Sequence, residues 1–138
     1  MNRFLGLRAV ALPIVVLFLA ACGGQQAASV PTEVHVTLRE FTVEMDKTSI
    51  PAGPVTFIIE NAGGLEHELV LEKAGDNDVP FEADGVESEA EAIAPGSSAS
   101  FDWTIDEPGQ YQLACHVDQD GVDHFGLGML LTFTVTEK

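Results

Sequence analysis

Short apolar runs with a period of two, separated by turns rich in glycine and proline, constrain the fold of this chain more than any other feature. Apolar and polar side chains alternate in residues 34–38, 100–105 and 131–135. Residues 55–60 are mostly β-branched or aromatic, and turn sequences flank them on both sides. Such runs predict β-strands, and no long amphipathic helical pattern interrupts them. The sequence therefore predicts an all-β fold, a Greek-key β-sandwich.

One stretch departs from this pattern of strands and turns. Residues 72–92 carry eight acidic side chains and a single basic one, Lys73. Because runs of like charge stay solvated, we expect a long acidic loop here, with one helical turn at residues 87–92.

The beginning of the chain has the pattern of an export signal. Arg3 and Arg8 flank an apolar run over residues 9–22, which is shorter than the roughly 20 residues of a membrane-spanning helix. A positive flank followed by a short apolar run and small residues is typical of a secretory signal peptide. The run ends in Leu19-Ala20-Ala21-Cys22, which resembles the bacterial lipoprotein box, where the chain is cut before an acylated cysteine.

This resemblance implies three segments. They are a lipoprotein signal peptide at residues 1–21, a lipidated flexible tether at residues 22–32 and one folded domain at residues 33–138. It also implies lipid-anchored attachment to a membrane through Cys22, on the extracytoplasmic or periplasmic side of a bacterial cell envelope. An ordinary signal peptide, with no lipid on Cys22, is the alternative interpretation.

The charge of the chain narrows the possible partners. Of the 138 residues, 22 are acidic and 6 are Lys or Arg, which gives a formal net charge of −16. Such a surface cannot neutralise phosphates, so a nucleic-acid partner is excluded. Removal of residues 1–21 takes away Arg3 and Arg8 and lowers the charge from −16 to −18. We expect this field to attract a basic protein partner and to act mainly on the rate of encounter. Adaptation to salt or simple solubility would explain the acidity equally well.

Four side chains carry the chemistry: His67, Cys115, His124 and Met129. Two imidazoles, a thiolate and a thioether form a borderline-soft donor set, which selects copper over calcium or magnesium. A His₂Cys site with a weak axial Met is typical of blue copper. Met129 could instead be an ordinary core residue at the start of a strand.

Three motifs in this order resemble those of the cupredoxins, the small blue (type 1) copper proteins. The first is Asn61-Ala62-Gly63 followed by His67, the second is Glu107-Pro108-Gly109-Gln110-Tyr111 leading to Cys115, and the third is residues 124–129. The likeness covers residues 34–136. It implies a cupredoxin-like domain with one mononuclear type 1 copper, held by His67, Cys115, His124 and Met129.

One departure from the family concerns the second histidine. Eight residues separate Cys115 from His124, whereas cupredoxins commonly have two to four. Doubling a loop from four to eight residues costs only about 0.6 kcal/mol of closure entropy. The insertion is polar and turn-forming, so we expect it to bulge outward. His116 is the rival ligand, but side chains of successive strand residues point to opposite faces.

A closed donor set leaves no open coordination position, whereas catalytic metal sites keep one. The predicted function is therefore not enzymatic. We expect a monomeric carrier of single electrons between envelope redox partners, possible partners being c-type cytochromes with a basic face. A copper-binding protein for periplasmic copper delivery or tolerance is the alternative, and a cupredoxin-like module without physiological metal is a third.

Overall fold

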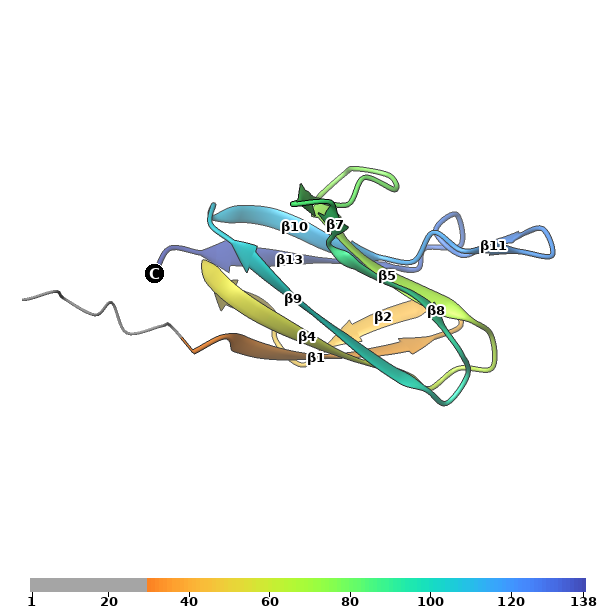
Figure 1. The fold of residues 1–138 in the computed structure, drawn as a ribbon. Coiled ribbons are helices and arrows are strands. Elements are labelled where there is room, and N and C mark those ends of the chain that lie inside the picture. Colours follow the sequence, from red (N-terminus) through yellow and green to blue (C-terminus); the bar gives the residue numbers. More distant parts are fainter. Residues whose placement is uncertain (1–29) are drawn as a thin grey trace, which may run out of the picture.

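The computed structural model describes residues 30–138, which form two β-sheets packed face to face (Figure 1). The first sheet has the strand order β2-β1-β4-β9, and the second has the order β3-β13-β10-β5-β8. The first comprises β1 (Thr32–Arg39), β2 (Thr42–Met45), β4 (Gly53–Asn61) and β9 (Ser98–Ile105). The second comprises β3 (Ser49–Pro51), β5 (His67–Lys73), β8 (Glu89–Ile93), β10 (Gly109–Ala114) and β13 (Leu130–Thr136). The predicted all-β sandwich is confirmed.

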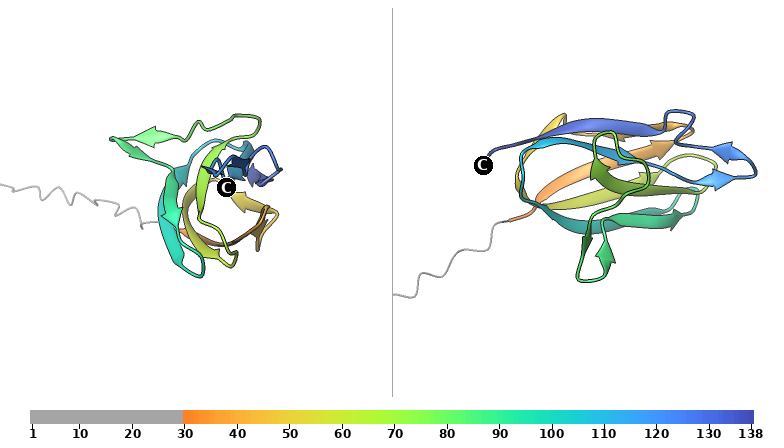
Figure 2. Two further views of the ribbon diagram at one scale, coloured as in Figure 1. Left: turned by 90° about the vertical axis from the view of Figure 1, so that its right-hand side faces the viewer. Right: turned by 90° about the horizontal axis from the view of Figure 1, so that it is seen from above.

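The alternation of the sequence explains which side chains fill the space between the sheets. Along β1 and β4 every second residue is buried, as a strand with one face on the core requires. The two sheets face each other (Figure 2), and apolar side chains from both fill the space between them. Its fully buried side chains include Val34, Leu38, Phe57, Ile59, Leu69, Leu71 and Leu113.

Two small hairpins project from the sandwich. One is β6 (Glu82–Ala83) with β7 (Val86–Glu87), and the other is β11 (Asp118–Gln119) with β12 (Val122–Asp123). The β11–β12 hairpin contains the insertion between Cys115 and His124, and it extends from one end of the molecule (Figure 1). Its turn residues, Asp120 and Gly121, both have positive φ, as a type I′ turn requires. The insertion therefore bulges outward as a paired ladder.

The prediction for residues 72–92 was wrong in part. In place of the helical turn expected at residues 87–92, Glu87 ends β7 and Glu89–Ile93 form the strand β8, which pairs with β5 at the edge of the second sheet. Glu72 belongs to β5 and is fully buried. The sheet edge supplies hydrogen-bond partners to the backbone here, and this tertiary pairing overrides the helical preference of the Glu and Ala residues.

No helix within residues 30–138 is long and apolar enough to cross a membrane. The predicted signal peptide, and Cys22 with most of the tether, lie outside the described residues. β1 begins at Thr32, one residue before the predicted start of the folded domain.

Candidate metal centre

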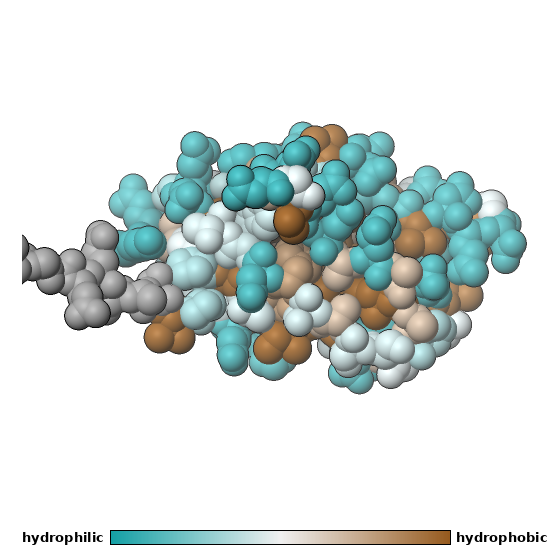
Figure 3. Space-filling model, viewed as in Figure 1, coloured by the Kyte–Doolittle hydropathy of each residue, from teal (hydrophilic) through white to brown (hydrophobic). Residues whose placement is uncertain are grey.

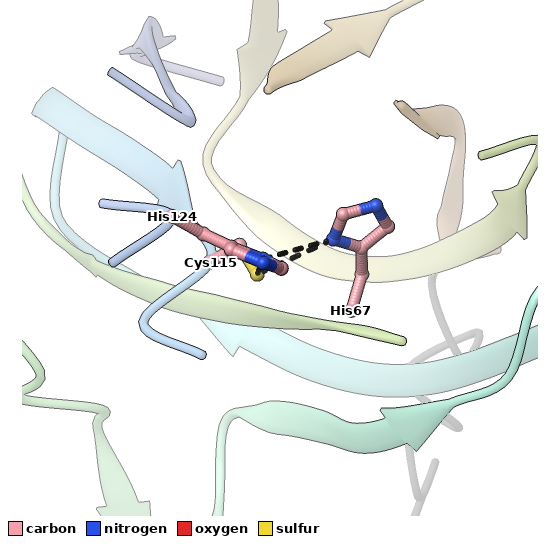
Figure 4. Close-up of side chains that lie close together, drawn as sticks. All are labelled: His67, Cys115 and His124. Carbon is pink, nitrogen blue, oxygen red and sulfur yellow. Dashed lines mark hydrogen bonds between the residues drawn. The ribbon is translucent and has the colours of Figure 1, made fainter. Parts of the chain in front are cut away.

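The ends of three segments bring His67, Cys115 and His124 together at one end of the sandwich (Figure 4). His67 is the first residue of β5, Cys115 follows the last residue of β10, and His124 follows the β11–β12 hairpin. All three side chains are fully buried. Within the described residues they form the one group of three or more His, Cys, Asp or Glu side chains close enough to hold a metal ion.

The donor atoms form a compact triangle. The Nδ1 atoms of His67 and His124 lie 3.2 Å apart, and the Cys115 Sγ lies 3.8 Å from the first and 3.5 Å from the second. A triangle with these sides has a point about 2.0 Å from each corner, which is close to the roughly 2.0–2.3 Å bonds that first-row metals such as zinc make to His nitrogen and Cys sulfur. The three donors therefore fit a single small metal ion in trigonal coordination.

Backbone hydrogen bonds hold the loop around these donors. The Cys115 N–H donates to the Met129 carbonyl at 3.0 Å, and the Met129 N–H donates to the His124 carbonyl at 3.1 Å. The His124 N–H donates in turn to the Val117 carbonyl at 3.0 Å. Met129, the predicted axial ligand, is thus held by its backbone between Cys115 and His124, with a fully buried side chain.

Asn61 organises the segment that leads into His67. Its side-chain Nδ2 donates to the carbonyls of Leu65 and Ile93, both at 2.8 Å, and its Oδ1 accepts from the Gly63 N–H at 2.9 Å. Because Asn61 is fully buried and these three bonds fix the turn, the strand that begins at His67 starts from a defined position.

Burial also sets the protonation of the donors. Burial raises the pKa of the Cys115 thiol, although nearby backbone N–H groups of Glu68 and Val117 act in the opposite direction. Burial, followed by the neighbouring His124 ring, lowers the pKa of His67. The free thiol and imidazole therefore favour their neutral forms, and a metal ion that binds must displace the thiol proton.

His116, the rival ligand, lies apart from this cluster. β10 ends at Ala114, so strand alternation no longer dictates the direction of His116. Its Nε2 lies 3.0 Å from Oε1 of the buried Glu72, and its ring stacks on Phe125 with centroids 4.5 Å apart. This packing gives His116 partners of its own outside the donor triangle.

Two residues that the sequence did not single out contact the imidazoles. The turn between β1 and β2 places Glu40 Oε1 3.4 Å from Nε2 of His67. The same turn places the ring centroid of Phe41 5.0 Å from the ring centroid of His124. His124 is fully buried, so its ring presents no exposed edge beside the hairpin. No local sequence pattern marks either contact, because both join segments far apart in the chain.

An all-β sandwich with a buried His-Cys-His cluster defines a class of small metal-binding proteins, and comparison with known families specifies which one. The model of the cupredoxin-like domain family matches residues 10–123. The chain therefore belongs to the cupredoxin-like family. The match includes His67 and Cys115 and ends one residue before His124. The family and the donor cluster together support one copper as the cofactor.

Solved structures with the same fold include three auracyanins. Auracyanin B is 23% identical, with a TM-score of 0.59, over 80% of this chain and 93% of that one. Auracyanin A, a blue copper protein from Chloroflexus aurantiacus, is 21% identical, with a TM-score of 0.55, over 78% and 100%. Auracyanin from Roseiflexus castenholzii is 21% identical, with a TM-score of 0.54, over 80% and 99%. At these identities the likeness is one of fold. No curated protein matches the chain.

Proposed function

We propose that the protein carries single electrons between redox partners of the bacterial envelope, through one type 1 copper held by His67, Cys115, His124 and Met129. The donor triangle carries the proposal, because two imidazole nitrogens and one sulfur already converge around a point about 2.0 Å from each. Bound copper would supply a one-electron couple between its two oxidation states. The similarity to auracyanins, one of which is described as a blue copper protein, supports this function.

The chain's own residues would hold the donors in place and exclude water. The three donor side chains and Met129 are fully buried, so solvent has no direct access to the ion. The four donors leave no open position for a substrate, and the four histidines of the sequence are too few for the second copper centre of the copper oxidases. These features favour a carrier over an enzyme.

The placement of β1 relative to the metal centre supports a tethered carrier. The start of β1 and the C-terminus lie at one end of the sandwich, and the β11–β12 hairpin lies at the other (Figure 1). The three donor residues sit at the hairpin end, where β5 begins and β10 stops. A lipid on Cys22 would therefore leave the metal centre pointing away from the membrane, towards a partner.

The partner that we propose is a protein with a basic face, such as a c-type cytochrome. Asp118, Asp120 and Asp123 belong to the projecting hairpin, and all three are exposed. Hydrophilic residues cover this end of the molecule, as they do much of the face shown (Figure 3). Because these three negative charges lie at the end that holds the metal centre, they would help to steer a basic partner to the end where the electron leaves.

The experiment that tests the function is a visible absorption titration of the domain from Val30 onward with copper(II). We expect one copper per chain and an intense blue colour, because the bond between a cysteine thiolate and copper(II) produces the colour of type 1 sites. Cys115→Ser should abolish the band. A colourless copper-loaded wild-type domain would contradict the electron-carrier proposal.

A further inference from the structure

The outward nitrogen of His67 has an unusual environment. Nε2 is buried and has no partner within hydrogen-bond geometry. The charged group beside it is the carboxylate of Glu40, whose Oε1 lies 3.4 Å away. When Nδ1 of a neutral imidazole binds a metal, the ring proton must sit on Nε2. That proton would then face a carboxylate oxygen.

The Glu40 carboxylate is itself held in place. Oε1 accepts from the N–H groups of Gly64 and Leu65, at 2.6 and 2.7 Å. The backbone hydrogen bond from Leu65 is the main influence that lowers the pKa of Glu40, so the group is ionised at neutral pH. Its side chain is 31% exposed, yet the oxygen nearest His67 is fixed by two donors.

Gly63 shows how closely the carboxylate is packed. A Cβ atom at this position would lie 2.5 Å from Oε1 and 2.8 Å from Oε2 of Glu40. Non-bonded carbon and oxygen do not approach so closely, so a side chain at residue 63 would displace the carboxylate. The glycine therefore permits the position that Glu40 takes beside His67.

We propose that Glu40 is a positioning residue of the copper centre, which accepts the Nε2–H of His67 and makes its Nδ1 a stronger donor. Carboxylates that accept from a metal-bound imidazole fix its tautomer and raise its basicity. The negative charge favours the more positive, oxidised metal ion and so lowers the reduction potential. This inference rests on the proposed copper function.

The test compares Glu40→Gln with Glu66→Gln in the copper-loaded protein, by potentiometric titration and by copper(II) affinity. Gln keeps a carbonyl oxygen for the Gly64 and Leu65 donors, so the loop retains its hydrogen bonds. Glu66 precedes His67 directly but is exposed, so its variant reports the loss of a nearby charge alone. We expect Glu40→Gln to weaken copper(II) binding 10- to 100-fold. If the affinity for copper(II) falls tenfold relative to that for copper(I), the reduction potential rises by 59 mV. Glu66→Gln should change both quantities far less, because its charge is screened.

Equal potentials in the two variants would overturn the role of Glu40, while a blue wild-type protein would leave the copper function standing. Gly63→Ala provides a second variant if Glu40→Gln does not fold. It keeps the charge of Glu40 but moves the carboxylate, and we expect the potential to rise again. An unchanged potential in Gly63→Ala would also overturn the inference, and a colourless wild-type protein would overturn it together with the proposed function.

Discussion

Replacement of His116 by alanine tests which of two histidines, His116 or His124, is the second imidazole ligand. If His124 is the ligand, as the donor triangle indicates, His116→Ala should leave the blue absorption nearly unchanged and lower the stability of the metal-free domain. His124→Ala should have the opposite effect on the spectrum and abolish or drastically alter it. The two variants are matched, since each removes one buried imidazole from the same loop.

The loss of stability can be estimated from what His116 contacts. Its side chain is 6% exposed, and its Nε2 lies 3.0 Å from the fully buried carboxylate of Glu72. A hydrogen bond to a charged group contributes about 1.5–3 kcal/mol, and an aromatic stack such as that on Phe125 about 0.5–1.5 kcal/mol. Glu72 keeps donors from Val79 and Gln112, at 2.9 and 2.7 Å, which limits the cost. We expect a loss of about 2–3 kcal/mol in the free energy of unfolding, or about 10 °C in Tm.

The assay has two parts. Chemical denaturation without copper gives the free energy of unfolding, so that metal binding does not contribute to the difference. The visible spectrum with copper(II) then reports the ligand set. Loss of the blue band in His116→Ala, with its retention in His124→Ala, would refute the assignment. A wild-type stability in His116→Ala would refute the estimate and show that the contact with Glu72 contributes little.

Three further predictions concern the axial ligand, a partly buried acid and the anchor. Met129→Leu should keep the blue colour and raise the reduction potential measured by redox titration, because a weak donor is lost; an unchanged potential would favour a plain core role. Burial, together with a hydrogen bond that the protonated Glu89 donates to the Glu87 carboxylate, raises the pKa of Glu89 to about 7. The folded state therefore binds this proton more tightly than the unfolded state, with its ordinary value of 4.5. The resulting stability is complete below pH 4.5 and disappears as the pH rises through about 7. Glu89→Gln should reduce the fall in Tm between pH 5 and 8, and an unaltered fall would contradict this. Cys22→Ala should move the protein from the membrane to the soluble fraction on cell fractionation, and continued membrane attachment would argue against a lipid there.

A fourth prediction addresses the partner. The rate of electron transfer to a basic cytochrome, measured by stopped flow, should fall steeply between 0.01 and 0.15 M salt, as the Debye length shrinks from about 30 to about 8 Å. Replacement of Asp118, Asp120 and Asp123 by asparagine should make the electron-transfer rate less dependent on salt. A rate that salt does not change would remove steering from the proposal.

The principal strands could be predicted from the sequence because their alternation reflects burial on one face only. Residues 34–38, 55–60 and 131–135 lie in β1, β4 and β13. The short β2 and β3 were not predicted, because three or four residues carry too little periodicity. β8 was mistaken for a helical turn because its Glu and Ala residues favour a helix locally, whereas its strand conformation depends on pairing with the distant β5.

The candidate site, too, was predictable from the sequence only in part. The sequence predicted three donors that the fold brings together, because each lies in a short motif with a distinctive spacing. The contacts behind the donors were not predictable. Glu40 and Phe41 follow an ordinary strand, and only the sheet order, which places β1 beside β4, brings their turn to the two imidazoles.

The distinction between carrying electrons and delivering copper depends on how firmly the donors are held. Delivery requires a ligand that can leave, and a long unpaired loop before His124 would provide one. The extra residues instead form the β11–β12 ladder, in which Asp118 pairs with Asp123 and Gln119 with Val122. The backbone of His124 is hydrogen-bonded at both its N–H and its carbonyl. An electron carrier gains from such rigidity, because donors that keep the same positions in both oxidation states reduce the reorganisation that each electron transfer requires. The added length therefore favours electron transfer over delivery, the reverse of what a loose loop would suggest.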